Sequence, residues 1–255
     1  MIHDWRAERT RRRDSFDARN DTIQDERSVT VLRLGVGVIG IVLPLALPLG
    51  NWLFAELRGL STAEFWPASM SGAYYTSTRN ILVGSLCALG VFLVCYRFDR
   101  RDDRWSTAAG VCALGVALFP TTPANATTFQ TTIGALHLVF AGLLFFVLAM
   151  FCVHSFRDPH YEQRRWVGRG YLAAGVAILA LLLLAVVAGV THFGTDWTVR
   201  PVYLCEWLAT WAFGAAWTGA AFELASATGA LGRSAALPHQ SGARAVPADG
   251  PTANP

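Results

Sequence analysis

The sequence predicts an all-α membrane protein, a bundle of six transmembrane helices with both termini in the cytoplasm. Of the 255 residues, 53% are hydrophobic and only 15% are charged, whereas about a quarter of the residues of soluble domains are charged. The apolar residues gather in six runs, and each run is near the ~20 residues that a helix needs to cross a bilayer of ~30 Å. The basic residues, all of them arginine, lie almost entirely in the connections that this topology places on one side.

The first three runs cover residues 29–54, 80–96 and 105–119. The first follows a charged segment and is too long for the apolar part of a cleavable signal peptide, so we expect it to remain as a helix. The second begins directly after a stretch rich in hydroxyl groups. The third is the shortest, and its length makes it the weakest of the six predictions.

The last three runs cover residues 131–153, 170–190 and 202–222. The fifth contains the uninterrupted apolar sequence ILALLLLAVVAGV. A segment inside a bilayer must satisfy its own backbone hydrogen bonds, so each run is predicted to be helical.

The distribution of arginine sets the orientation. Only Arg58, Arg79 and Arg200 of the 21 basic residues fall in the connections on the outer side. Five or seven crossings would place arginine clusters on opposite sides of the membrane, which makes six the best count.

The chain divides into one membrane domain and two tails. Residues 29–224 form the predicted six-helix domain. Residues 1–28 are an Arg-rich cytoplasmic tail that is predicted to be disordered or loosely helical. Residues 225–255 are rich in Pro, Ala and Gly and are predicted to be a disordered cytoplasmic tail.

Polar residues gather at the outer ends of three helices. The stretch FWPASMSGAYYTSTRNILVG precedes and enters the second helix. His137 lies about six residues into the fourth helix and Glu206 about five into the sixth, so both are roughly 8–9 Å deep at 1.5 Å per residue. Ionisable residues inside a membrane are costly and are functional hypotheses by default. We therefore expect a polar pocket, open outward, with these candidate binding residues: Ser69, Ser71, Tyr74, Tyr75, Arg79, His137 and Glu206.

Two interpretations of this constellation remain open. The polar residues either line a pocket or hold helices together by hydrogen bonds; an ion pair between Arg79 and Glu206 is compatible with both. If the protein is an enzyme, the catalytic residues are His137 as base and Glu206 as the group that orients it. Ser71 and His137 are a further possible pair of nucleophile and base. No close His, Cys or acidic spacing typical of a metal site occurs, so we expect no metal and no cofactor.

The pattern resembles the Frag1/DRAM/Sfk1 family of six-helix membrane proteins, and it is similar to bacterial DUF998-type membrane proteins. The matching residues are Pro67, Ser69 and Ser71 before the second helix, His137 and Ala141 in the fourth, and Glu206 with Trp207 in the sixth. The resemblance covers roughly residues 30 to 224. It implies the six-helix fold and a link to membrane lipid remodelling or distribution. The acidic residue usual in the first outer motif of that family is missing from SMSGAYY.

The leading functional prediction is binding of a lipid or another amphiphile at the outer leaflet of a bacterial inner (plasma) membrane. The alternatives are an enzyme acting on a lipid headgroup and a small-solute transporter. The expected partners are membrane lipids. The net charge of +3 is too small to favour nucleic acid.

Overall fold

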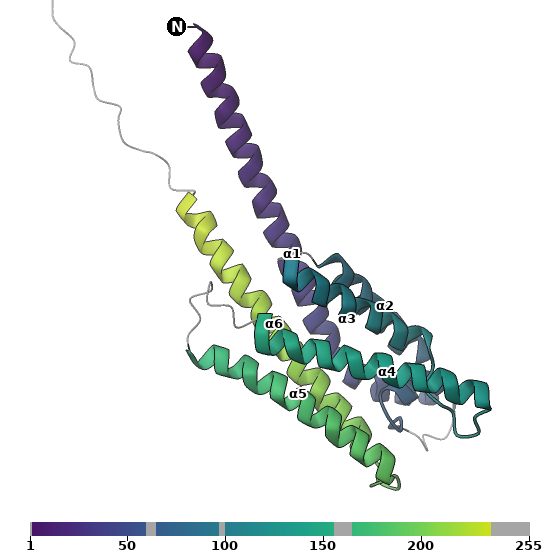
Figure 1. Cartoon of the computed structure of the whole chain (residues 1–255). Coiled ribbons are helices and arrows are strands. Elements are labelled where there is room, and N and C mark those ends of the chain that lie inside the picture. The colour runs from purple at the N-terminus through teal and green to yellow at the C-terminus, as the bar shows by residue number, and fades with distance from the viewer. Residues whose placement is uncertain (1, 60–64, 97–99, 156–164, 236–255) are drawn as a thin grey trace, which may run out of the picture.

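The computed structural model describes residues 2–59, 65–96, 100–155 and 165–235, and within these ranges all regular structure is helical (Figure 1). Six long helices are joined by a short 3₁₀ helix, η1, and by a π-helical turn, η2. In chain order the elements are α1 (Ile2–Leu57), η1 (Ser71–Tyr75), α2 (Arg79–Cys95), α3 (Arg100–Leu118), α4 (Thr128–Met150), η2 (Phe151–Ser155), α5 (Arg165–Thr191) and α6 (Pro201–Ala235).

The first and last helices extend beyond the apolar runs. α1 already begins at Ile2, so the helix includes the segment for which a disordered or loosely helical tail is predicted. α6 continues past residue 224 to Ala235. The prediction of disorder for the end of the chain falls on residues 236–255, which lie outside the described residues.

Three of the helices are long and apolar enough to cross a membrane: Ser28–Leu57, Thr128–His154 and Trp166–Thr191. α2 is apolar but shorter. The helix α5 exposes much of its apolar surface; for example, Leu183 is 64% and Val190 is 75% exposed. Apolar helices with such exposed faces are typical of membrane proteins, in which lipid covers them.

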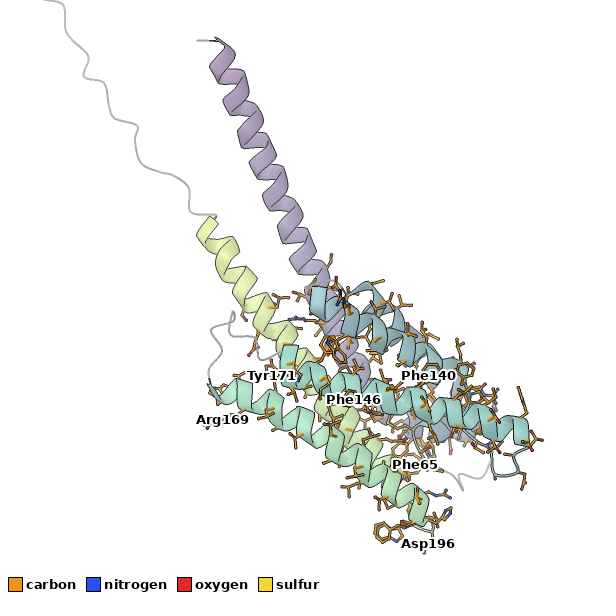
Figure 2. The ribbon with its side chains drawn as sticks, in the orientation of Figure 1. Phe65, Phe140, Phe146, Arg169, Tyr171 and Asp196 are labelled. Carbon is orange, nitrogen blue, oxygen red and sulfur yellow. The ribbon has the colours of Figure 1, made fainter. Side chains whose placement is uncertain are left out.

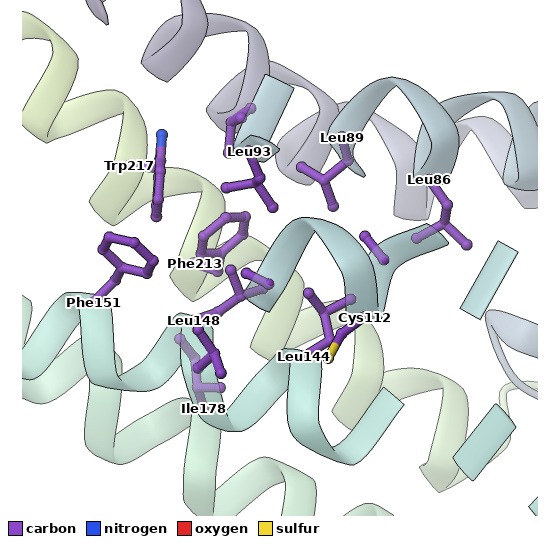
Figure 3. Packing of buried hydrophobic residues seen from close by; sticks show 14 of the residues in the cluster. Leu86, Leu89, Leu93, Cys112, Leu144, Leu148, Phe151, Ile178, Phe213 and Trp217 are labelled. Carbon is purple, nitrogen blue, oxygen red and sulfur yellow. The ribbon is translucent and has the colours of Figure 1, made fainter. Parts of the chain in front are cut away.

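The six helices pack as a closed ring. Each helix contacts its neighbours in chain order, and α6 packs along α1, so that the two ends of the chain close the bundle. Aliphatic side chains from α2 and α4 meet Phe213 and Trp217 of α6 in the interior (Figure 3).

Glycines permit the closest approaches between helices. A Cβ on Gly110 of α3 would lie 2.7 Å from the carbonyl oxygen of Gly90 on α2. A Cβ on Gly40 of α1 would lie 3.1 Å from the Cα of Gly214 on α6. Both pairs are backbone contacts that a side chain would force apart, as in other helix pairs with small residues at the interface.

α1 contains Pro44 and Pro48. Proline has no N–H, so Pro48 cannot donate the usual helical hydrogen bond to the carbonyl of Pro44, four residues earlier. The hydroxyl of Tyr203 on α6 donates to that carbonyl instead, at 2.6 Å. By the same rule Pro44 leaves the carbonyl of Gly40 without its helical donor.

Candidate binding site

A central cavity of about 80 Å³ lies inside the ring of helices. α1, η1, α2, α3, α4 and α6 contribute to its wall, and most of the lining is aliphatic. Figure 3 shows several of the lining side chains, including those from α2 and α4. The lining residues are Ile39, Gly40, Leu43, Met70, Ser71, Leu82, Leu86, Leu89, Val116, Ala141, Leu144, Phe145, Leu148, Glu206, Thr210 and Phe213.

The polar side chains of the lining are Ser71, Glu206 and Thr210, which come from η1 and the first part of α6. One carboxylate oxygen of Glu206, Oε2, accepts a hydrogen bond from the backbone N–H of Met70 at 2.5 Å. Its other oxygen has no hydrogen-bond partner among the described residues. The Thr210 hydroxyl donates to the Glu206 carbonyl at 2.7 Å and lies 3.8 Å from the Met70 sulfur. The cavity is therefore polar at the end that holds η1 and apolar elsewhere.

Aromatic rings hold the segment before η1 against α6. Trp66 stacks on Trp207, with ring centroids 5.7 Å apart, and meets the edge of Tyr203 at 5.6 Å. Ser69 accepts a hydrogen bond from the N–H of Gly72 at 2.8 Å, which closes the turn into η1. These contacts place Met70 and Ser71 over the cavity, next to Glu206.

Two of the seven predicted site residues, Ser71 and Glu206, line the cavity. The other five do not: Ser69, Tyr74, Tyr75, Arg79 and His137. Arg79 donates from Nε to the Tyr74 carbonyl at 2.6 Å, and its guanidinium lies 4.8 Å from the centre of the Tyr74 ring. The Tyr75 hydroxyl donates to the Thr121 carbonyl at 2.5 Å and joins η1 to the connection between α3 and α4. The ion pair between Arg79 and Glu206 that the sequence suggests is not formed. Arg79 instead contacts the carbonyl and the ring of Tyr74.

Partial burial raises the pKa of Tyr75 above its ordinary value; the neighbouring Tyr74 raises it further, and Arg79 lowers it. The phenol is therefore neutral at pH 7 and keeps the proton that it donates to Thr121.

His137 is buried, with 3% of its surface exposed, but it does not line the cavity. A residue of α4 that does so is Ala141, one turn further along the helix. Its Nδ1 lies 2.6 Å from the carbonyl oxygen of Phe119, which can only accept, so Nδ1 carries the proton. Phe119 follows the last residue of α3, where helix carbonyls lack intrahelical donors. The contact ties α4 to the end of α3, as the interpretation of a structural clamp requires. Ser71 and Glu206 thus share the cavity, and His137 is held elsewhere.

Sequence reasoning missed the amide and hydroxyl pair between α1 and α2. The hydroxyl of Thr78 donates to the side-chain oxygen of Asn51 at 3.1 Å, and both residues are buried. Asn51 lies near the end of the first apolar run and Thr78 just before the second, and this proximity to the same connection is the signal in the sequence.

A larger polar cluster lies at the other end of the bundle. Arg33 is 4% exposed and donates to the Tyr96 hydroxyl from Nε at 3.0 Å and from Nη2 at 2.5 Å. Nη1 of Arg33 donates to the Ala220 carbonyl at 3.3 Å. The Tyr171 hydroxyl donates to Glu223 at 2.9 Å. Figure 2 shows Tyr171 near the start of α5, far from Asp196 beyond its other end. Arg33 is one of the arginines that the topology prediction assigns to the inner side, but its side chain is buried inside the bundle.

Among the described residues no group of three or more His, Cys, Asp and Glu side chains is placed to hold a metal ion. Comparison of the chain with protein-family models, with curated proteins and with solved structures finds no match. The resemblance to the Frag1/DRAM/Sfk1 family therefore stays a prediction.

Proposed function

We propose that this chain is a six-span protein of a bacterial inner membrane, with both termini cytoplasmic, that binds a lipid or another amphiphile. The apolar part of the ligand occupies the central cavity, and its polar group meets Glu206 and Ser71 at the outer leaflet. The observation that carries the proposal is the polarity of the cavity lining, with its polar side chains at the end that holds η1 and aliphatic side chains along the rest.

The size of the cavity defines how much of a ligand enters. Sites for drug-sized molecules have volumes of roughly 300–1,000 Å³, and this cavity measures about 80 Å³. A short stretch of an aliphatic chain fits that space, so the rest of a long-chain ligand lies outside the cavity or enters when the helices separate.

The lipid-headgroup enzyme and the transporter receive less support from the same residues. A general base must lie within hydrogen-bond reach of the group it serves. His137 donates to Phe119 and does not line the cavity, whereas Glu206 accepts from Met70 and does. No single observation favours either alternative over binding.

Native mass spectrometry of the purified chain tests the proposal, with identification of the retained lipids. The variant Ala141→Phe fills the cavity from α4, because Ala141 is one of its lining residues. Gly142→Phe is the matched control on the next position, where an added Cβ meets nothing within 4 Å.

We expect the wild type and Gly142→Phe to retain the same amphiphile and Ala141→Phe to lose it. Equal retention by Ala141→Phe and the wild type would show that the ligand does not use the cavity. Absence of any specifically retained amphiphile from the wild type would reject the proposed function.

A further inference from the structure

The polar end of the central cavity is rich in hydrogen-bond acceptors and lacks a cation. No Lys, Arg or His is among the lining residues. Arg79, the first residue of α2, is engaged by the Tyr74 carbonyl and ring. The carboxylate of Glu206 therefore faces the cavity with no opposite charge supplied by the described residues.

Several acceptors converge there. Glu206 uses Oε2 for the Met70 N–H, which leaves its other oxygen available. Thr210 gives its proton to the Glu206 carbonyl or the Met70 sulfur and keeps its lone pairs. The side-chain donors in the lining are the hydroxyls of Ser71 and Thr210, and Thr210 already donates to the Glu206 carbonyl.

An ionised carboxylate in apolar surroundings is unfavourable unless a cation or several donors compensate it. A ligand with a carboxylate or a phosphate at this place would add like charge to Glu206 and would find few donors. A primary ammonium carries one positive charge and three N–H donors, which match one charge and several acceptors.

We infer that the site recognises amphiphiles through a primary ammonium group, which pairs with the free oxygen of Glu206 while the adjoining aliphatic chain extends between the leucines of α2 and α4. This inference rests on the proposed function and specifies its ligand class. The shared chemistry is an alkylammonium, whether it belongs to a lipid headgroup or to a free amine.

The test measures binding of hexylamine, hexanol and hexanoate to the full-length chain in detergent by isothermal titration calorimetry at pH 7. The three probes share a chain and differ in the head group. We expect hexylammonium to bind most tightly and hexanoate least. Glu206→Gln keeps an acceptor for the Met70 N–H and removes the charge, and we expect it to weaken hexylammonium binding about 10- to 100-fold, the range for losing a hydrogen bond to a charged group.

Asp196→Asn is the matched control, because Asp196 is an exposed acid in the connection before α6, and its removal should leave hexylammonium binding unchanged. The ranking of the three probes on the wild type does not depend on whether Glu206→Gln folds. Thermal unfolding and gel filtration of the variant check its folding.

The possible results separate the two proposals. Binding of hexanol or hexanoate as tight as that of hexylammonium, or equal binding by Glu206→Gln and the wild type, overturns the ammonium inference and leaves amphiphile binding standing. No binding of any probe also overturns the inference, while the lipid retained in native mass spectrometry decides the proposed function independently. A lipid with a primary amine that is retained by the wild type and lost from Glu206→Gln would identify a lipid as the source of the ammonium.

Discussion

Replacement of Tyr203 by Phe isolates one hydrogen bond in the contact between α1 and α6. Tyr203 is fully buried, and its hydroxyl donates at 2.6 Å to the carbonyl of Pro44. Phenylalanine keeps the ring and therefore its edge contacts with Trp66 and Trp207. The substitution removes the donor and leaves the carbonyl buried, since Pro48 has no N–H to offer.

The expected loss of unfolding free energy is about 1–2 kcal/mol. An unsatisfied buried acceptor costs about 1–3 kcal/mol, and interhelical hydrogen bonds in membrane proteins average about 0.6 kcal/mol with a maximum near 1.7. We expect a value in the upper part of the range for membrane proteins, because no backbone N–H of α1 can take the place of the Tyr203 hydroxyl at the Pro44 carbonyl.

A double-mutant cycle with Pro48→Ala tests the physical reason. Alanine at position 48 supplies an N–H to the Pro44 carbonyl, so Tyr203→Phe should cost less than about 0.5 kcal/mol in that background. The assay is equilibrium unfolding in mixed micelles, followed by far-ultraviolet circular dichroism. Tyr74→Phe is a control of the same chemistry, and we expect it to lie within about 0.5 kcal/mol of the wild type. An equal cost of Tyr203→Phe with Pro and with Ala at position 48 would refute the reasoning.

Three further predictions follow from contacts in the bundle. Tyr96→Phe removes the acceptor of two guanidinium N–H groups of buried Arg33, so we expect a loss of about 2–3 kcal/mol of unfolding free energy in the same assay; an effect within experimental error would show that the guanidinium is solvated. Gly110→Ala places a Cβ 2.7 Å from the Gly90 carbonyl and should lower the free energy of unfolding by about 1–3 kcal/mol. The control Gly142→Ala, whose Cβ meets nothing within 4 Å, should be neutral or stabilising by up to about 1 kcal/mol. Equal effects of the two substitutions would contradict the close packing of α2 on α3. Tags fused to the two chain termini should be digested by protease in inverted vesicles and protected in intact spheroplasts, and digestion of one tag in spheroplasts would contradict the proposed six spans.

The helices were readable from the sequence because the apolar runs are long and separated by charged or hydroxyl-rich connections. The predicted second run, 80–96, differs from α2, Arg79–Cys95, by one residue at each end. The all-helical fold and the presence of helices long enough to span a membrane are confirmed, and the count of six spans stays a prediction. The ends of α1 and α6 were harder to predict, because the charged start of α1 and the Ala-, Ser- and Gly-rich end of α6 carry no strong hydropathy signal.

Only part of the candidate site followed from the sequence. Counting residues along a helix gives the depth of His137 and Glu206, but depth does not tell which way a side chain faces. That direction depends on the rotation of each helix, which is set by contacts such as the Gly40 approach to Gly214. As a result Glu206 faces the cavity, and His137 meets the end of α3. The two prolines of α1 are visible in the sequence, and so is the loss of the helical donor to the Pro44 carbonyl. The residue of α6 that supplies a donor instead, Tyr203, is not.

The closed ring of helices has a consequence for biosynthesis. Five of its six contacts join helices that are consecutive in the chain and can form as each helix is made, whereas the contact of α6 with α1 joins residues as far apart as Arg33 and Ala220. Domains form from the N-terminus onward during translation, so the wall of the cavity stays open towards lipid until α6 arrives. The last helix also brings Glu206 and Thr210. A nascent chain that stops before Pro201 therefore lacks both the α6 side of the cavity and its carboxylate, so the proposed binding requires complete synthesis of the last helix.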